Sequence, residues 1–279
     1  MLQSMSNSYT AIRGYQQMLD VAAHNIANVN SSAYKEKQVS FHELPYRGLA
    51  ERRLPVSGNS TVQLRNGSGV AVADITASFD TGILSPSKNQ WDMAVAGEGF
   101  FRVIKPDGGY AYTRSGNFTM DSEGNLFLNG GFRLDLFLDF QDMDHQIDFS
   151  SLNVTPEGRF YAYAVREAGE DLKAGEEGVL SHAAIELGKL TLYRFTNPQS
   201  LSSLGGNLFL PSEATGPPQE GGGGENGFGK IRQGYLEGSN VDISRQMTML
   251  ILGQKALQAS ARALTSADEI WGITLNLQT

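Results

Sequence analysis

Apolar residues recur at helical spacing at both ends of the chain, whereas the middle carries short alternating runs. Over residues 2–26 they recur at alternating intervals of three and four, and the same spacing returns over residues 243–275. This spacing places apolar side chains in one narrow seam along a helix, the pattern of a coiled coil. Because a helix cannot bury its own seam, each end is predicted to need a partner helix.

Polar residues mark the predicted inner ends of both helices. Asparagine tolerates left-handed backbone, so three asparagines near residue 28 favour a helix end there. Ser239 or Asn240 is the expected N-cap of the last helix, and Asp242 places an acid in its first turn. The predicted assembly interface combines the seams with these polar residues: Leu2, Met5, Ile12, Leu19, Asn25, Ile26, Asn28, Asn30, Asn240, Asp242, Ile243, Met247, Leu250, Leu257 and Leu264.

A second interpretation of the seams stays open, in which both helices are ordinary amphipathic helices packed on the β domain. Polar Gln16, Gln254 and Asp268 interrupt the seams. The C-terminal register nevertheless holds over four heptads, which favours coiled-coil packing between the two ends or between subunits.

The middle of the chain is predicted to be a mainly antiparallel β domain. Turn residues separate three pairs of apolar runs, which predicts hairpins. Further strands are expected over residues 134–140 and 187–195. The fold class is therefore α+β, with a mainly antiparallel central β domain and long terminal helices that pair as a coiled coil. The predicted hairpins join 100–105 to 110–114, 118–120 to 126–128, and 153–155 to 160–165.

Composition divides the chain into predicted domains. The ends, 1–30 and 236–279, form a terminal helical domain for assembly, and 31–75 form an extended arm. Residues 76–210 form the β-rich domain. Residues 211–235, rich in glycine and proline, are predicted to be a flexible linker and return segment.

Charge and cysteine content exclude several classes of function. The 279 residues carry a net charge of −8 and no basic stripe, which argues against nucleic-acid binding. Absence of cysteine excludes disulfides and thiolate sites. No cleavable signal peptide is expected. The sequence contains no run of 18 or more apolar residues, so no membrane-spanning segment is predicted.

Three short motifs resemble chemical sites, and each has a structural interpretation that we favour. Residues 224–230 have the glycine and lysine spacing of a phosphate loop, but Ile231 stands where a hydroxyl would hold Mg²⁺. Residues 121–125 resemble the start of a calcium loop but suit a hairpin turn better. Asp142, Asp144 and His145 lack a second nearby histidine, which favours a solvated loop. We therefore predict no catalytic, cofactor or metal site, and no enzyme.

The motifs at both ends and in the centre resemble those of one family. Residues 19–30, LDVAAHNIANVN, with Ala33-Tyr34-Lys35, resemble the N-terminal signature of bacterial flagellar rod and hook proteins. Residues 233–242 and the helix through 266–269 resemble its C-terminal signature. Residues 92–101 and 112–118 look like the β domain of the basal-body rod proteins, of the distal-rod type. One departure is Ser31-Ser32-Ala33, where the family usually has Thr-x-Gly and a tight turn.

This resemblance implies a structural subunit of the flagellar rod, self-assembling into the axial drive shaft that transmits torque to hook and filament. It implies export without cleavage by the flagellar type III apparatus, and a location in the basal body within the cell envelope. The implied partners are copies of itself and other axial proteins of the rod and hook. A secreted β-domain adhesin or binding module, and an envelope enzyme such as a wall hydrolase, remain as alternatives.

Overall fold

The computed structural model describes residues 2–45, 47–48, 65–121, 124–136, 152–163 and 184–276. The chain forms two compact units. The helical unit comprises Met1–Val29, Glu36–Ser78 and Val241–Thr279, and the β unit comprises Asn30–Lys35 and Phe79–Asn240. The chain therefore passes from one unit to the other at four places, after residues 29, 35, 78 and 240.

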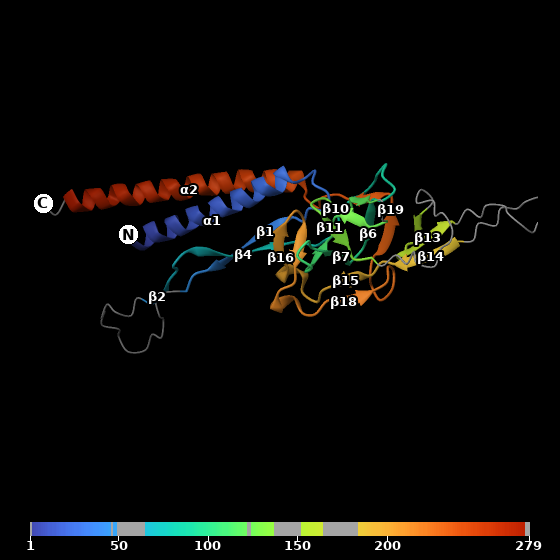
Figure 1. The fold of residues 1–279 in the computed structure, drawn as a ribbon. Coiled ribbons are helices and arrows are strands. Elements are labelled where there is room, and N and C mark those ends of the chain that lie inside the picture. The colour runs from blue at the N-terminus through green and yellow to red at the C-terminus, as the bar shows by residue number, and fades with distance from the viewer. Residues whose placement is uncertain are drawn as a thin grey trace, which may run out of the picture. The chain divides into compact units, whose positions relative to one another are not determined.

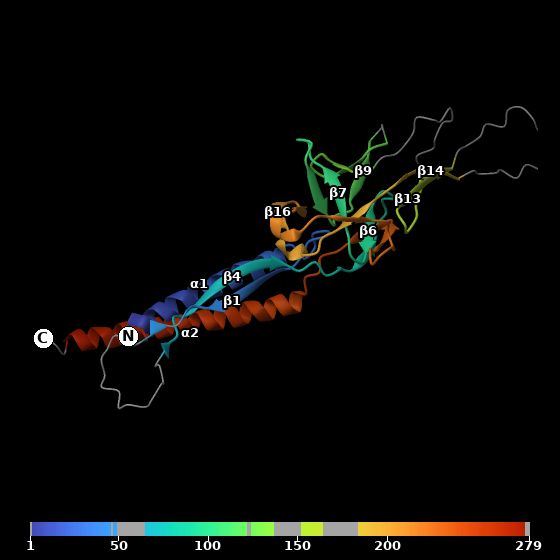
Figure 2. The ribbon, with the colours of Figure 1, turned by 90° about the horizontal axis from the view of Figure 1, so that it is seen from below.

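The helical unit is built on two long antiparallel helices, α1 (Leu2–Ala27) and α2 (Ile243–Asn276), which lie side by side (Figures 1 and 2). Strands β1 (Lys37–Glu43) and β4 (Val70–Ala77) pair antiparallel and pack on α1. The short strands β2 (Arg47–Gly48) and β3 (Arg65–Asn66) pair with each other. These strands fall in the segment predicted as an extended arm with a short strand or two, although β4 ends two residues beyond its predicted limit at residue 75.

Glycine at position 14 of α1 allows this strand pair to approach the helix closely. The nearest side chain to Gly14 is Phe41 of β1, whose Cε1 would lie 3.0 Å from an added Cβ. The ring of Phe41 also contacts that of Tyr15, with 6.4 Å between centroids. A residue that weakens an isolated helix therefore makes room for tertiary packing.

The β unit consists of short strands in antiparallel pairs. Its largest sheet, within the described residues, has nine strands in the order β16-β17-β8-β7-β11-β10-β9, with β15 paired to β7 and β18 paired to β15. A three-stranded sheet, β12-β13-β14, and the pairs β19-β6 and β20-β5 complete the described strands. The strands are β5 (Leu84–Pro86), β6 (Met93–Ala96), β7 (Phe100–Ile104), β8 (Tyr110–Thr113), β9 (Phe118–Met120), β10 (Leu126–Leu128), β11 (Phe132–Leu134), β12 (Asn153–Val154), β13 (Arg159–Tyr163), β14 (Ala184–Lys189), β15 (Leu192–Arg194), β16 (Ser202–Gly205), β17 (Leu208–Leu210), β18 (Gln219–Gly221), β19 (Lys230–Gln233) and β20 (Tyr235–Glu237).

Alternation along β7 places side chains in two cores. Phe101 and Val103 join the larger core, in which Phe118 and Phe160 are also fully buried. Phe100 points to the other face and joins an aromatic cluster with Tyr112, Tyr193, Phe195 and Phe209. These rings meet edge to face, which is the favoured geometry for aromatic pairs. Successive side chains of β7 therefore pack into different cores on the two faces of the sheet.

The three predicted hairpins are confirmed, since β7 pairs with β8, β9 with β10, and β12 with β13. The strand predicted over 187–195 is instead two strands. β14 pairs with β13, whereas β15 pairs with β7 and β18, so the chain changes sheets at Leu190. β11 ends at Leu134, and residues 137–140 of the predicted strand lie outside the described residues.

The segment predicted as a flexible linker supplies strands β18 and β19 to the β unit. Ile231 of β19 is buried in the larger core. A Cβ added at Gly221 would lie 2.2 Å from the ring of Phe228, so glycine is required for this close contact. Glycine here permits backbone to approach a side chain, which composition alone does not distinguish from flexibility.

The tight turn expected from the family pattern is formed at Ser31-Ser32-Ala33, although the chain has alanine in place of glycine. Ala33 is buried and has φ of 56°, the left-handed conformation that glycine adopts without strain. Its backbone N–H donates to the carbonyl of Glu237 at 2.8 Å. The fold therefore holds an alanine where the family usually has glycine.

Candidate assembly interface

One side of α2 packs on α1 with heptad spacing. Less exposed positions of α2 recur at alternating steps of four and three: Gln246, Leu250, Gly253, Leu257, Ser260, Leu264 and Ala267. A Cβ added at Gly253 would lie 2.8 Å from Met18 Cε and 2.9 Å from Leu19 Cδ2. The helices therefore approach closely at Gly253, where α2 has no side chain. This seam is the geometry expected of an antiparallel coiled coil.

The predicted seam residues fall into two groups in the structure. On α1, Met5, Ile12, Leu19 and Ile26 are all half-buried. On α2, the three leucines named in the sequence prediction are half-buried too: Leu250, Leu257 and Leu264. Ile243 and Met247 differ, because their side chains are 44% and 52% exposed. The side chain of Leu2 lies outside the described part of the chain.

The exposed side of α2 carries an outer apolar face in two bands. The first band spans residues 243–252 and the second spans 270–273. Between them, exposed positions are polar or small, as at Gln254, Gln258 and Arg262. A surface helix is normally apolar on one side only, so a second apolar side indicates a further partner. The exposed side chains are Ile243, Met247, Met249, Ile251 and Leu252 in the first band, and Ile270, Trp271 and Ile273 in the second.

Sequence reasoning missed five of these exposed residues: Met249, Ile251, Leu252, Ile270 and Ile273. The available signal was the nearly continuous apolar run MTMLIL at 247–252, which exceeds what one seam requires. Two further exposed apolar side chains of the helical unit, Phe41 on β1 and Ile75 on β4, were also missed.

A buried polar network joins the end of α1 to the start of α2. The Asn25 side chain accepts from the Lys37 N–H at 3.0 Å and donates to the Lys37 carbonyl at 2.8 Å. It also donates to Gln246 Oε1 at 3.2 Å, and Gln246 Nε2 donates to Glu36 Oε1 at 2.8 Å. Because buried polar groups must be paired, this network favours one alignment of the two helices.

The other predicted polar residues act locally. Asn28 Nδ2 donates to the His24 carbonyl at 2.9 Å at the end of α1, and Asn30 is exposed. Asp242 is the N-cap of α2, since its Oδ1 accepts from the N–H groups of Ser244 at 2.8 Å and Arg245 at 3.3 Å. The prediction that residue 239 or 240 caps this helix is therefore wrong, because α2 begins at Ile243.

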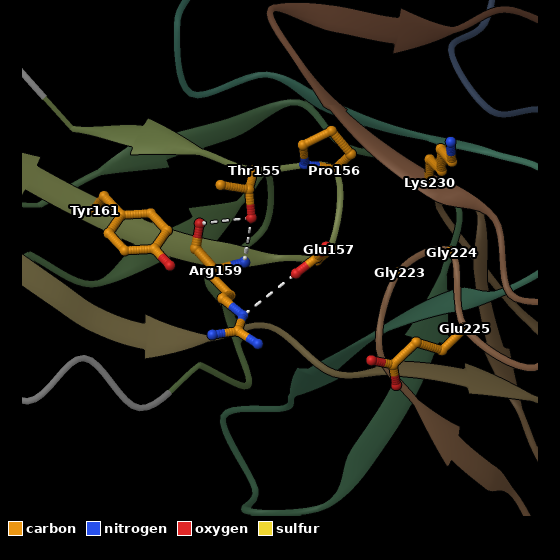
Figure 3. Close-up of a pocket in the computed structure, with 9 residues that line it drawn as sticks. All are labelled: Thr155, Pro156, Glu157, Arg159, Tyr161, Gly223, Gly224, Glu225 and Lys230. Carbon is orange, nitrogen blue, oxygen red and sulfur yellow. Dashed lines mark hydrogen bonds and ion pairs between the residues drawn. The ribbon is translucent and has the colours of Figure 1, made fainter.

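The β unit contains an open hollow of about 780 Å³ (Figure 3). Arg159 and Glu157, which line it, form an ion pair at 3.4 Å. Lys230 and Glu225 also line the hollow, so both signs of charge are present. Its remaining lining residues are Thr155, Pro156, Tyr161, Gly223 and Gly224.

The glycine-rich loop beside this hollow uses its backbone donors internally. The N–H of Gly224 donates to the Gly229 carbonyl at 3.2 Å, and that of Phe228 donates to the Glu225 carbonyl at 2.8 Å. A phosphate loop needs such donors to face the ligand, so this loop is a turn. Of the motif at 121–125, residues 122 and 123 lie outside the described residues. Between β9 and β10 the Asp121 N–H donates to the Asn125 carbonyl at 2.9 Å, and the Gly124 N–H donates to the Asp121 carbonyl at 3.0 Å, as in a hairpin turn.

Within the described ranges, no group of three or more histidine and acidic side chains is placed to hold a metal ion. The predicted loop around Asp142, Asp144 and His145 lies outside these ranges. Among the described helices, none has the length and hydropathy needed to span a membrane.

Comparison with known proteins agrees with this geometry. Residues 94–162 match the family of the flagellar hook protein FlgE/F/G D1 domain, and residues 232–277 match the flagellar basal body rod FlgEFG protein C-terminal family. The first match covers β7 to β13, and the second covers α2 and the strand before it.

Full-length relatives extend the similarity over the whole chain. The flagellar basal-body rod protein FlgG of Borreliella burgdorferi is 30% identical over 286 residues, covering 100% of this chain and 99% of the relative. FlgG of Agrobacterium fabrum is 29% identical over 275 residues, with 98% of each covered. FlgG of Bacillus subtilis is 28% identical over 282 residues and covers 100% of both. The chain belongs to the family of flagellar basal-body rod proteins.

Proposed function

We propose that this chain, a structural subunit of the flagellar rod, joins copies of itself and other axial proteins through the outer apolar face of α2. The observation that carries this proposal is the presence of two apolar sides on one helix. The inner side is packed on α1, and the outer side carries Met247, Ile251 and Leu252 in solvent. The family matches support a rod subunit and give no support to a secreted binding module or an envelope enzyme.

The size of the outer face suits repeated weak contacts. Full burial of a large apolar side chain contributes about 1.5–3 kcal/mol. Fixing one subunit against another costs about 4–15 kcal/mol, so one band of partly exposed side chains gives a marginal pairwise contact. In a helical array each subunit makes several such contacts, and a head-to-tail contact that does not close continues as a tube. The proposal therefore predicts weak association in solution and stable association in the rod.

We also infer that the flagellar type III apparatus exports the chain before assembly. Absence of cysteine supports this route, because no disulfide needs to form or break along it. The apolar seams support this route as well. A helix whose seam is not yet packed against its partner gains too little free energy to offset its ordering entropy, so the terminal segments can be exported unfolded.

Counting hooks in a strain that lacks the gene tests the assembly proposal. The strain is complemented with the wild-type chain, with Ile251→Asp on the outer face, or with Leu257→Asp in the inner seam. Gln258→Asp, at an exposed polar position of the same helix, is the matched control. We expect wild-type hook numbers with the control and almost no hooks with either other variant.

Circular dichroism and amide exchange of the purified chains separate the two mechanisms. Ile251→Asp should keep the helix pair as stable as in the wild type, whereas Leu257→Asp should weaken it while the β unit remains folded. Wild-type hook numbers from Ile251→Asp would contradict the outer-face proposal. Normal hooks in the uncomplemented strain would contradict the role as a rod subunit.

A further inference from the structure

Within the helical unit, the C-terminal end of α2 extends beyond the described part of α1 (Figure 1). Leu19 of α1 lies next to Gly253 of α2. Because the two helices run antiparallel, each residue further along α2 meets one residue earlier in α1, so Leu2 lies opposite about residue 270. Residues 270–276 of α2 therefore continue past the start of the described α1.

This end of α2 is apolar around most of its circumference. The side chains of Ile270, Trp271 and Ile273 are 50%, 39% and 60% exposed. Successive residues of a helix are about 100° apart, so Trp271 and Ile273 leave the helix in directions about 200° apart. A Cβ added at Gly272, between them, would meet no atom within 4 Å. A helix that is apolar on several sides is normally buried, so this end indicates a partner.

The first band of the outer apolar face carries a stripe that complements this end. Arg245, Met249 and Leu252 recur at steps of four and three, so they lie along one line on α2, and all three are exposed. The line therefore consists of a cation followed by two apolar side chains. At the other end of α2, exposed Asp268 stands four residues before Gly272, so an anion is followed along one line by an open space.

A single displacement brings these two lines together. When a second α2 lies alongside in the same direction, shifted by about 23 residues or about 35 Å, Asp268 of one copy lies beside Arg245 of the other. The same shift places Gly272 beside Met249. The flexible side chain of Met249 can then fill the open space at Gly272 and contact Trp271, a favourable pairing of sulfur and aromatic ring.

An antiparallel arrangement of two α2 helices does not satisfy both contacts. Placing Met249 beside Gly272 would then set Asp268 opposite Gly253, which is on the inner seam. Placing Asp268 beside Arg245 would set Gly272 opposite Val241, which precedes α2. Charge and packing are therefore satisfied together only when both helices run in the same direction.

Charge along the whole of α2 favours the same contact. From residue 243 to residue 267 the helix carries only cations, Arg245, Lys255 and Arg262, and it then continues with Asp268 and Glu269. The start of one α2 therefore attracts the end of another. Two α2 helices in the same direction without a shift would instead place like charges side by side.

We propose that the C-terminal end of α2, residues 268–273, docks on the first band of a second copy of this chain, in the same direction and displaced by about 35 Å along the helix. This proposal rests on the proposed function, because it names the two parts of α2 that meet when copies assemble. The two surfaces differ, so the contact is head-to-tail and leaves the first band of one copy and the end of the other open for further copies.

The absence of cysteine allows this contact to be tested by disulfide crosslinking. A chain with both Met249→Cys and Gly272→Cys is expressed beside the wild-type chain in a strain that lacks the gene, so that rods assemble. Rods purified with their hooks are oxidised and analysed on non-reducing gels. We expect disulfide-linked dimers and longer multimers, because the two positions lie about 35 Å apart within one helix and can meet only between copies.

A chain with Gln258→Cys and Gly272→Cys is the matched control. Gln258 is exposed on the same helix but lies about 13 Å along it from Met249, beyond the reach of a disulfide, so this chain should stay monomeric. Neither Met249→Cys nor Gly272→Cys alone should give dimers. Dimers of a single variant as abundant as the multimers of the double variant would show a two-fold contact and overturn the proposal.

The amount of variant chain in the rods distinguishes failure of this contact from failure of the proposed function. A reducing gel measures that amount. If the double variant is present in rods and forms no multimers, the proposed contact is wrong, while the role as a rod subunit stands. If the double variant does not enter rods, an exchange of charges decides.

The charge exchange uses chains that each complement the deletion strain alone. Arg245→Asp and Asp268→Arg bring like charges together, and each should lower hook number at least about threefold, since the loss of a modest exposed pair recurs at every contact. The combined variant restores opposite charges and should recover at least about half of the loss. Lys255→Asp with Asp268→Arg, which has the same net charge, should recover nothing. A combined variant no better than its single variants, or single variants with wild-type hook number, overturns the proposal.

Discussion

Two glycines of α2 allow a matched test of how closely the helices pack. Gly253 lies in the inner seam, where an added Cβ would meet Met18 and Leu19 of α1 at 2.8 and 2.9 Å. At Gly272, an added Cβ would meet no atom within 4 Å. The same substitution, glycine to leucine, therefore changes helix propensity equally at both sites but changes packing at only one of them.

The expected energies follow from these two surroundings. Replacing a helical glycine with leucine gains about 0.5–1 kcal/mol from backbone propensity. At Gly253 the new side chain must displace two packed side chains, and overpacking costs typically about 1–3 kcal/mol. We therefore expect Gly272→Leu to raise the free energy of unfolding by about 0.5–1 kcal/mol. Gly253→Leu should lower it by about 0.5–2 kcal/mol.

Urea unfolding of the full-length variants, followed by far-ultraviolet circular dichroism, measures both values. Met18→Ala in the Gly253→Leu background should recover part of the loss, because it vacates the space that the new side chain needs. Equal stability of Gly253→Leu and Gly272→Leu would refute the argument that α2 needs a small residue at its contact with α1.

Three further predictions concern single groups. Asn25→Ala leaves buried backbone groups unpaired and should lower the free energy of unfolding by about 1–3 kcal/mol in urea, whereas Asn30→Ala, at an exposed site, should change it little. Gly116→Ala would place a Cβ 1.5 Å from the Met93 carbonyl oxygen, so a loss of at least about 3 kcal/mol is expected in thermal unfolding. Burial raises the pKa of Tyr193 from 10.0 to about 12. The folded state then holds its proton where the unfolded state loses it, so this stabilisation is complete below pH 10 and is lost as pH rises through 12. An absorbance titration of Tyr193→Phe should lack one phenolate transition centred near pH 12, and a missing transition near pH 10 instead would contradict the assignment.

The helices were predictable from local periodicity, but the seam of α2 was predictable only in part. The spacing of apolar residues, at intervals of three and four, assigned Ile243 and Met247 to the seam. In the structure Gln246 and Gly253 occupy the inner side, the first through a hydrogen bond and the second through absence of a side chain. Neither residue is hydrophobic, so the spacing of apolar residues alone could not predict which side of α2 faces α1.

The hairpins of the β unit were predictable because their turns are local. Residues 106–109, Pro-Asp-Gly-Gly, favour a turn whatever surrounds them, and β7 and β8 follow from it. The pairing of β19 with β6 joins residues 230–233 to 93–96, and no local signal specifies such a partner. Glycines that permit close contacts, such as Gly221, were read as flexibility for the same reason.

The buried ion pair between Lys35 and Glu237 in the β unit could not be predicted from the sequence, because a charged residue normally lies at the surface. Lys35 and Glu237 are separated by 202 positions, and each is ordinary by composition. Only the fold shows that each compensates the burial of the other. Both residues stand within the motifs that suggested the family, yet the motifs themselves did not reveal that they meet.

The distribution of exposed apolar residues on α2 constrains how assembly can proceed. The first band, 243–252, and the second, 270–273, are separated by about five helical turns in which exposed positions are polar or small. A partner helix lying along the whole outer face would bury polar Gln254, Gln258 and Arg262 without compensation. Two partners, each covering one band, would avoid this cost. The pattern therefore favours contacts with more than one neighbour for each α2, which a helical array supplies and an isolated dimer does not.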